Sequence, residues 1–231
     1  MKPDGKIFPI CMTIAGSDSG AGAGIQADLK TFGSLDCYGV SVITSVTAQN
    51  TKGVSDIHII PNSVLKNQIN SIKEDIGFNA VKTGMLPEDS TVIDVAESLK
   101  GLNELKLVID PVIVATSGDI LISLKAINAL KEKLFPLATV ITPNLSEAEE
   151  LTQIEIRTKD DVYQACKILK NYGGGCHQKI GVSYIHHKHG TVVSKRGEDE
   201  KGAHFEHWYL KVNKKNESSC NNIKQIYPES L

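Results

Sequence analysis

The sequence predicts an α/β fold in which a mostly parallel sheet is covered by helices on both faces. Strand patterns alternate with amphipathic helix patterns as far as residue 172. The strand patterns are short, continuous apolar runs, which are typical of strands buried on both faces. A chain of 231 residues is long enough for one such domain with a full hydrophobic core.

The first half of the chain alternates regularly between the two kinds of element. We expect strands at Lys6–Ala15, Val40–Val46 and Ala80–Thr83, and helices at Gly24–Ser34, Asn62–Gly77 and Ser90–Lys100. The second of these helices carries Leu65, Ile69, Ile72 and Ile76 at helical spacing, which predicts one buried face.

The alternation continues in the second half. We expect strands at Lys106–Asp110 and Ala138–Thr142, and helices at Ser123–Phe135 and Thr158–Tyr172. Ser123 is the expected N-cap of the first helix. Thr158 and Asp161 have the spacing of a capping box, and Gly173 is expected to close the last helix.

Composition and charge argue against several classes of partner and location. The formal net charge of -2 offers no electrostatic reason to expect a nucleic acid or an anionic membrane as partner. No apolar run is long enough for a spanning helix, and the N-terminus resembles a strand more than a signal peptide. Five cysteines, an odd number without regular spacing, indicate reduced thiols and a cytoplasmic protein.

The pattern changes at Gly173. Six of the seven histidines and the only tryptophan lie beyond it, and only Lys179–Ile185 and Gly190–Ser194 resemble strands. The polar residues from about 211 onward are expected to form a poorly ordered tail. We therefore divide the chain into a body, residues 1–172, and a divergent C-terminal segment, residues 173–231, which we expect to be irregular.

A glycine-rich turn follows the first expected strand, in the sequence AGSDSGAGAGIQADLKTF at residues 15–32. Its glycines would let backbone N–H groups approach a polar ligand at the start of a helix. Gly16 and Asp28 are the candidate residues, although glycine here could serve turn geometry alone and Asp28 could merely compensate the helix dipole. The motif is neither a Walker loop nor a dinucleotide-binding fingerprint.

Two further strand ends carry residues suited to a flat ring. Gln49 follows a β-branched run, and its amide could pair with an aminopyrimidine edge, although it could also simply form a turn. Met85, in VKTGML, could supply a soft apolar wall.

Two more strand ends carry acidic residues. Asp110 ends a strand before the loop that contains Ser117, Gly118 and Asp119, in a position suited to a Mg²⁺ ion or phosphate. Asn144 and Glu147 lie three residues apart at a strand-to-helix junction, where Ser146 could alternatively cap the helix. Because Mg²⁺ takes most of its ligands from water and phosphate, Asp110 and Glu147 could form a water-mediated pair. All five strand ends meet at one edge of a parallel sheet, which predicts a site there.

In order and spacing, these motifs resemble the hydroxymethylpyrimidine/phosphomethylpyrimidine kinases of thiamine biosynthesis, which belong to the ribokinase-like superfamily. The resemblance covers roughly residues 8–172 and rests on AGSDSGAGAGIQADLKTF, TAQNTKGV, VKTGML, DPVIVATSGD and TPNLSEAE. It implies a three-layer α/β/α sandwich, usually a homodimer. It also implies transfer of the ATP γ-phosphoryl group to 4-amino-5-hydroxymethyl-2-methylpyrimidine and then to its monophosphate.

The resemblance also implies roles for individual residues. Gly16, Asp28 and Gln49 correspond to pyrimidine-contacting positions, with Met85 and Val112 as apolar walls. Asp110, Asn144 and Glu147 correspond to the side that binds ATP and Mg²⁺.

The family also has a Gly-Thr-Gly-Cys motif at a helix N-terminus, which binds the transferring phosphoryl group, and the sequence lacks it. Gly173-Gly174-Gly175-Cys176 comes too soon after Asn144, and a helix C-cap explains it better; Ser218-Ser219-Cys220 lacks the glycines. Our hypothesis is that a shifted reading frame or retained non-coding sequence replaced the segment after Gly173. Finding no such motif in any nearby frame of the gene would remove that idea. No catalytic residue is assigned from the sequence.

Several alternatives stay open. A pyridoxal or pyridoxine kinase acts on a similar ring, and a non-catalytic pyrimidine-binding relative would keep the pocket without turnover. A dinucleotide-binding oxidoreductase is disfavoured because no acid ends the second strand. The tail histidines, including His186, His187 and His189, fit no standard zinc spacing.

Overall fold

The computed structural model describes residues 8–102, 104–113, 121–173, 175–176, 182–184, 193–198 and 204–209. Its main sheet has seven strands in the order β3-β2-β1-β4-β5-β6-β7. Their bounds are Ile10–Asp18 (β1), Tyr38–Asn50 (β2), Gly53–Ile59 (β3), Ala80–Thr83 (β4), Leu107–Ile109 (β5), Val140–Ile141 (β6) and Gly175–Cys176 (β7). Every neighbouring pair is parallel except β2 and β3. The predicted, mostly parallel sheet is therefore confirmed.

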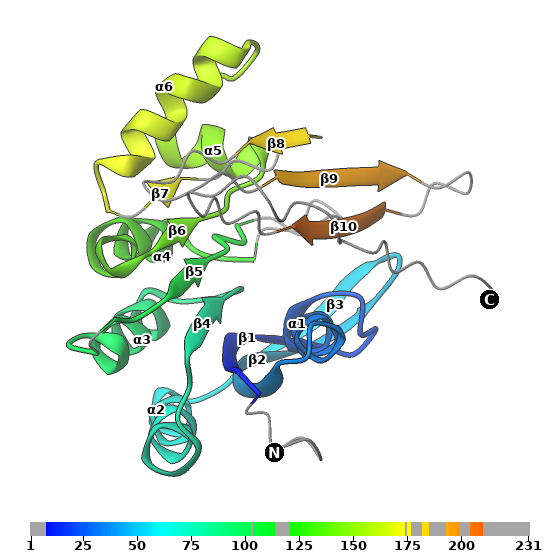
Figure 1. Ribbon diagram of the computed structural model, residues 1–231, viewed down its shortest axis with the longest axis vertical. Coiled ribbons are helices and arrows are strands. Elements are labelled where there is room, and N and C mark those ends of the chain that lie inside the picture. Colours follow the sequence, from blue (N-terminus) through cyan, green and yellow to red (C-terminus); the bar gives the residue numbers. More distant parts are fainter. Residues whose placement is uncertain are drawn as a thin grey trace, which may run out of the picture.

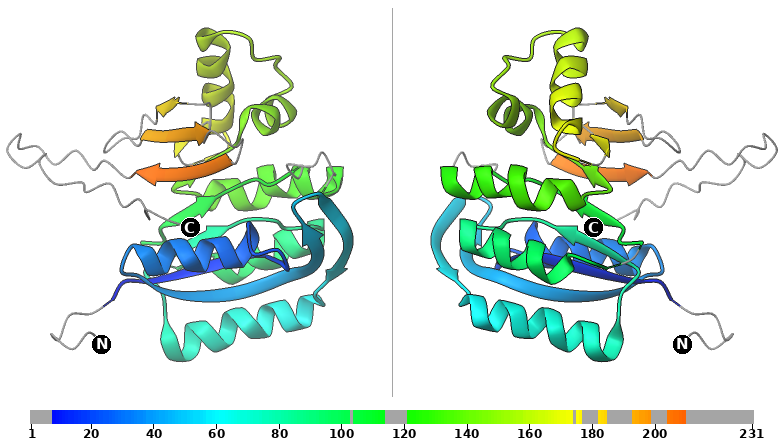
Figure 2. Two further views of the ribbon diagram at one scale, coloured as in Figure 1. Left: turned by 90° about the vertical axis from the view of Figure 1, so that its right-hand side faces the viewer. Right: turned by 90° about the vertical axis from the view of Figure 1, so that its left-hand side faces the viewer.

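Helices lie on both faces of this sheet, as the alternation predicted. Figure 1 shows α1 (Gly24–Ser34) on one face and α2 (Asn62–Ser71), α3 (Asp89–Leu99) and α4 (Leu124–Ala129) on the other. The two panels of Figure 2 look onto these two faces in turn. Two more helices, α5 (Leu145–Thr152) and α6 (Lys159–Lys170), pack against each other, and α6 also contacts β7.

The core lies between the sheet and the helices α2, α3 and α4. Met12, Ile14, Ile109 and Ile141 point into it from the strands and are fully buried. In the helix that starts at Asn62, Leu65, Ile69 and Ile72 are buried as predicted, but Ile76 is 40% exposed. The prediction for Ile76 was wrong because the helix widens into a π turn at Ile72–Ile76, which rotates its last residues off the buried face.

The two predicted N-caps are confirmed, but α6 ends at Lys170 with Asn171 as its C-cap, earlier than the predicted end at Gly173. The Ser123 hydroxyl accepts a hydrogen bond from the Ala126 N–H at 3.2 Å at the start of α4, which continues as a π turn, Leu130–Leu134, and a 3₁₀ turn, Phe135–Leu137. Thr158 and Asp161 form a capping box at the start of α6. The hydrogen bond from the Thr158 hydroxyl, followed by bonds from backbone N–H groups, lowers the pKa of Asp161.

The hairpin formed by β2 and β3 was not predicted. β2 is longer than the expected Val40–Val46, and β3 returns antiparallel to it after a tight turn in which the Asn50 side chain accepts a hydrogen bond from the Lys52 N–H at 2.8 Å. β3 was missed because polar residues interrupt its apolar pattern, as expected for a strand at the sheet edge.

A second, antiparallel sheet has the strand order β10-β9-β8, with bounds Val182–Tyr184 (β8), Val193–Glu198 (β9) and His204–Tyr209 (β10). β8 lies within the predicted strand Lys179–Ile185, and β9 overlaps the end of Gly190–Ser194. The tail predicted from about residue 211 lies outside the described residues. None of the helices in the described part of the chain is long and apolar enough to cross a membrane.

Candidate functional site

The glycine-rich turn between β1 and α1 is organised by one carboxylate. Asp18 is buried, and its Oδ1 accepts a hydrogen bond from the Gly20 N–H at 2.7 Å, while its Oδ2 accepts one from each of the Gly22 and Ala23 N–H groups at 2.9 Å. These amides therefore hold the turn together. These three N–H groups, which we expected to face a ligand, bond to an aspartate of the same turn instead.

Two glycines of this turn are required by close packing. Gly24 has φ +58°, and a Cβ there would lie 2.3 Å from the carbonyl oxygen of Gly16. A Cβ on Gly16 would in turn lie 2.9 Å from the Ser45 Oγ and 3.5 Å from the Met85 Sδ. Gly16 and Met85, both predicted from the sequence, thus lie together at the carboxyl ends of β1 and β4, and Ser45 joins them.

Asp28 belongs to a polar network that joins α1 to three strands. Its Oδ2 accepts hydrogen bonds from the Thr13 hydroxyl at 2.6 Å and from the Lys82 ammonium at 3.0 Å. The same ammonium lies 3.7 Å from the Oδ2 of Asp110. Two predicted residues from opposite sides of the site, Asp28 and Asp110, therefore share one cation.

Sequence reasoning did not single out Lys82 or Thr13. A lysine in the middle of a short strand whose other residues are apolar or small is a usable signal, because lysine is rarely buried unless it is paired. Asp18 was missed for a different reason: in the sequence it looked like one more turn residue.

Gln49 lies beside the glycine-rich turn, near the end of β2. Its backbone N–H donates to the Ser19 Oγ at 2.8 Å, and the Ser19 hydroxyl donates to the Gln49 carbonyl, also at 2.8 Å. Its side-chain Oε1 accepts from the Thr47 hydroxyl at 3.2 Å. The amide predicted to bind a ring is thus held next to the end of β1.

Val112 lies beyond the end of β5, separated from Asp110 by Pro111, and is half-buried. Its N–H donates a hydrogen bond to the Asp110 carbonyl at 2.9 Å. The loop with Ser117, Gly118 and Asp119 lies outside the described residues.

Asn144 and Glu147 form a capping box at the start of α5. The Asn144 Oδ1 accepts from the Glu147 N–H at 2.9 Å, and the Glu147 Oε2 accepts from the Asn144 N–H at 2.7 Å. Asn144 is the N-cap, so the alternative that Ser146 caps this helix was wrong. Glu147 is also buried. Both residues therefore have a clear role in the fold, beside the predicted role in nucleotide binding.

The carboxylates fit a hydrated Mg²⁺ better than a closed metal site. Within the described residues, no cluster of three or more His, Cys, Asp or Glu side chains could enclose an ion. Mg²⁺ commonly keeps several waters and needs only one or two carboxylates. Asp110 fits that role because it directly follows β5 at the carboxyl edge of the sheet and its side chain is 16% exposed. The Glu147 Oε2 is occupied by the Asn144 N–H.

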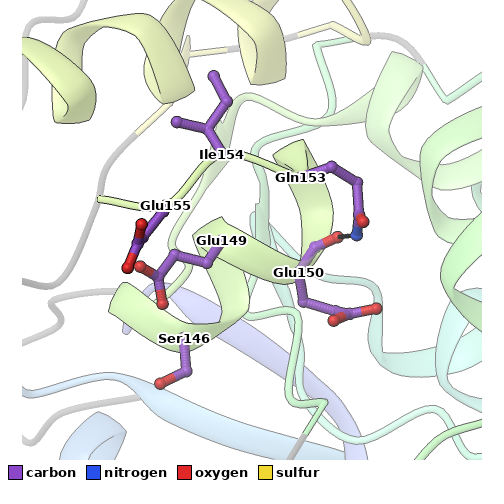
Figure 3. Close-up of a pocket in the computed structure, with 6 residues that line it drawn as sticks. All are labelled: Ser146, Glu149, Glu150, Gln153, Ile154 and Glu155. Atoms are coloured by element: carbon purple, nitrogen blue, oxygen red, sulfur yellow. Dashed lines mark hydrogen bonds between the residues drawn. The ribbon is translucent and has the colours of Figure 1, made fainter. Parts of the chain in front are cut away.

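An acidic hollow of about 430 Å³ lies against α5 and the residues that follow it (Figure 3). It is lined by Ser146, Glu149, Glu150, Gln153, Ile154 and Glu155. None of the predicted substrate-side residues lines it, and none of the six lining residues is a cation. The substrate side predicted from the strand ends is therefore a different place on the molecule.

The Gly173–Cys176 stretch has a structural role. Gly173 has φ +129°, and a Cβ there would lie 2.6 Å from the Pro136 Cα. Gly175 and Cys176 form β7, parallel to β6. Cys176 is thus in a strand and not at a helix N-terminus, which agrees with the structural interpretation of these glycines. The Ser218–Cys220 alternative lies outside the described residues.

Comparison with known proteins identifies the family. Residues 18–198 match the phosphomethylpyrimidine kinase family. The chain belongs to this family. The match extends past Gly173 as far as Glu198, so it includes part of the segment that we considered divergent.

Individual relatives agree with this assignment. The chain is 49% identical over 162 residues to a hydroxymethylpyrimidine/phosphomethylpyrimidine kinase of Haemophilus influenzae, covering 70% of this chain and 60% of the relative. It is 47% identical over 162 residues to the thiamine biosynthesis bifunctional protein ThiED of Geobacter sulfurreducens, covering 70% of this chain and 33% of that protein. The chain thus spans less than two thirds of the length of these curated relatives.

Solved structures share the fold. The crystal structure of a phosphomethylpyrimidine kinase from Clostridium difficile 630 matches with a TM-score of 0.74 and 42% identity, covering 80% of this chain and 83% of that one. A pyridoxal kinase from Staphylococcus aureus in complex with pyridoxal matches with a TM-score of 0.73 and 30% identity, covering 82% and 72%. The three-layer, ribokinase-like fold predicted from the resemblance is confirmed.

Proposed function

We propose that this chain binds 4-amino-5-hydroxymethyl-2-methylpyrimidine and its monophosphate and, with ATP and Mg²⁺, phosphorylates them in thiamine biosynthesis. The observation that carries the proposal is the arrangement at the carboxyl ends of β1, β4 and β5 in a chain of this family: Gly16 lies beside Met85, and Lys82 links Asp28 of α1 to Asp110. Open α/β sheets bind their ligands at this edge.

The family resemblance assigns the roles, and the chemistry of the side chains supports them. The Asp28 carboxylate and the Gln49 amide bind and orient the aminopyrimidine, since together they accept and donate hydrogen bonds. Gly16 leaves room for the ring, and Met85 and Val112 flank it. Asp110, Asn144 and Glu147 form the side that binds the nucleotide.

Mg²⁺ would neutralise phosphate charge on the nucleotide side, where Asp110 is the best-suited carboxylate. A homodimer and a cytoplasmic location are also part of the proposal. The odd number of cysteines, without regular spacing, favours a reducing compartment.

A coupled ATP assay with the pyrimidine and with its monophosphate, run beside calorimetry, tests the proposal. We expect binding of the pyrimidine and release of ADP. Replacing Gln49 by alanine should weaken binding by about 1–3 kcal/mol, because ring polar atoms lose their partner. An unchanged affinity would contradict the role of Gln49.

The second candidate is a pyrimidine-binding protein without turnover. It is favoured by one observation: Gly175 and Cys176, the end of the Gly-Gly-Gly-Cys stretch, form strand β7 and not the start of a helix. Pyrimidine binding without any phosphorylated product in the same assay would support it. Pyridoxal, tested in parallel, separates the third candidate, a pyridoxal kinase.

A further inference from the structure

A single lysine lies between the two carboxylates that the proposed function assigns to different ligands. The Lys82 Nζ is 3.0 Å from the Asp28 Oδ2 and 3.7 Å from the Asp110 Oδ2. Asp28 is assigned to the pyrimidine and Asp110 to the nucleotide side. Lys82 belongs to β4, which lies between β1 and β5 in the sheet. Asp28 follows β1 in the sequence, and Asp110 follows β5.

The backbone is built to accommodate this ammonium. Lys82 and Thr13 are register partners on the adjacent strands β4 and β1, so both side chains reach the same face of the sheet, toward α1. A Cβ on Gly84 would lie 3.1 Å from the Lys82 Nζ and 2.9 Å from the Ala15 Cβ. The absence of a side chain at Gly84 therefore leaves the space that the ammonium occupies at the end of β4.

The three charged side chains are largely shielded from water. Their exposed fractions are 21% for Lys82, 17% for Asp28 and 16% for Asp110. Ion pairs at this depth are screened less than surface pairs. Without the ammonium, two carboxylates would be left close together in a poorly solvated corner, and they would repel each other.

The hydrogen bonds also select one oxygen of Asp28. Thr13 and Lys82 both donate to Oδ2, and Oδ1 receives no hydrogen bond from any residue that the structure describes. The carboxylate is thus held by one oxygen, which leaves the other to accept a hydrogen bond from a ligand.

We propose that Lys82 is a positioning residue for pyrimidine recognition. It holds the Asp28 carboxylate by Oδ2, so that Oδ1 accepts an N–H of the aminopyrimidine, and it ties Asp28 to Asp110 on the nucleotide side. This inference rests on the proposed function, because it takes Asp28 as a pyrimidine-binding residue.

The test is calorimetric titration of the full chain with 4-amino-5-hydroxymethyl-2-methylpyrimidine, which needs no turnover. Lys82→Met should raise the Kd roughly 10- to 100-fold, the usual scale for losing a charge-assisted hydrogen bond. Lys82→Arg, which keeps the charge, should keep most of the pyrimidine affinity of the unmodified chain. In the double variant Asp28→Asn/Lys82→Met, the Kd should be close to that of Asp28→Asn alone, since both changes remove the same interaction.

The chain offers a matched control. Lys66 pairs with Asp94 at 2.6 Å between α2 and α3, away from the strand ends. Lys66→Met removes an ion pair of the same kind and should leave pyrimidine binding unchanged. If urea denaturation shows that Lys82→Met is not folded, Lys82→Gln replaces it. Glutamine removes the charge but keeps an N–H donor, so the Kd should rise less than in Lys82→Met, and an unchanged Kd would overturn the role of Lys82.

The outcomes separate this inference from the proposed function. If Asp28→Asn and Gln49→Ala weaken binding but Lys82→Met does not, the role of Lys82 is overturned and the pyrimidine site stands. Additive effects of Asp28→Asn and Lys82→Met would also overturn it. If the unmodified chain binds no pyrimidine, both proposals are overturned.

Discussion

Two polar clusters at the carboxyl edge of the sheet differ in where their side chains find partners. In the β1–β4–β5 corner, Asp28 and Asp110 come from separate elements and both contact Lys82, which comes from a third. At the β6–α5 junction, Asn144 and Glu147 satisfy each other within one helix turn. The first arrangement exists only in the folded sheet, whereas the second needs only a local helix start. The structure therefore supports a ligand site more strongly at the cluster of Asp28, Lys82 and Asp110 than at the capping box of Asn144 and Glu147.

The largest expected effect concerns two glycines of the same helix. Gly24→Ala should lower the free energy of unfolding by about 3 kcal/mol or more, because the new Cβ would overlap the Gly16 carbonyl oxygen at 2.3 Å and the residue has φ +58°. Gly33→Ala should raise it by about 0.5–1 kcal/mol, because its Cβ would meet nothing within 4 Å and alanine favours a helix. Urea denaturation measures both. If the free energy of unfolding changed in the same direction in both variants, the close packing described for Gly16 and Gly24 would be contradicted.

The next effect concerns the carboxylate that holds the glycine-rich turn. Asp18→Ala should cost about 2–3 kcal/mol of unfolding free energy, because three backbone N–H groups lose their acceptor. Asp75→Ala, at an exposed position, is the control and should be near neutral. If Asp18→Ala lowers the free energy of unfolding as little as the control does, water replaces the carboxylate, and Asp18 is not what holds the glycine-rich turn together.

A smaller effect sharpens the comparison at the β6–α5 junction. Asn144→Ala should cost about 1 kcal/mol, the usual value of a lost N-cap. Glu147→Gln should change stability by less than about 0.5 kcal/mol, because glutamine also serves in a capping box. If Glu147 has the proposed nucleotide role, the same variant should weaken Mg²⁺-dependent ATP binding severalfold in calorimetry. Unchanged ATP binding would leave Glu147 with a structural role alone.

The smallest effect lies at the opposite end of β1 from the site. Burial, followed by the neighbouring Cys37, raises the pKa of the Cys11 thiol from 9.0 to about 11. Alkylation of Cys11 by iodoacetamide at pH 8 should therefore be roughly 10- to 100-fold slower than for an ordinary thiol. The alkylation rate should keep rising with pH until about pH 11. Because the folded pKa is the higher one, any stability linked to this thiol is kept below pH 9.0 and lost as the pH rises through about 11. Mass spectrometry of the Cys11 peptide measures the rate, and an ordinary rate at pH 8 would contradict the described packing.

Local patterns in the sequence determined much of this protein. The apolar runs identified five of the seven strands of the main sheet, whereas β3 and the two-residue β7 were missed. Helix α1 and strand β4 have the bounds predicted for them. The caps at Ser123 and Thr158 also follow from spacing alone, because a cap is decided within one turn. Gly16 and Met85 could be assigned to one edge, because the carboxyl ends of parallel strands converge.

Only the tertiary structure decided how the polar side chains divide their hydrogen bonds. Asp18 and Asp28 lie ten positions apart in one motif, yet Asp18 is taken up by its own turn while Asp28 reaches Thr13 and Lys82. The contact between Asp28 and Lys82 spans 54 positions and depends on the β1–β4 register. No local pattern encodes such a contact, since it forms only when two strands that are distant in the sequence pair in the sheet.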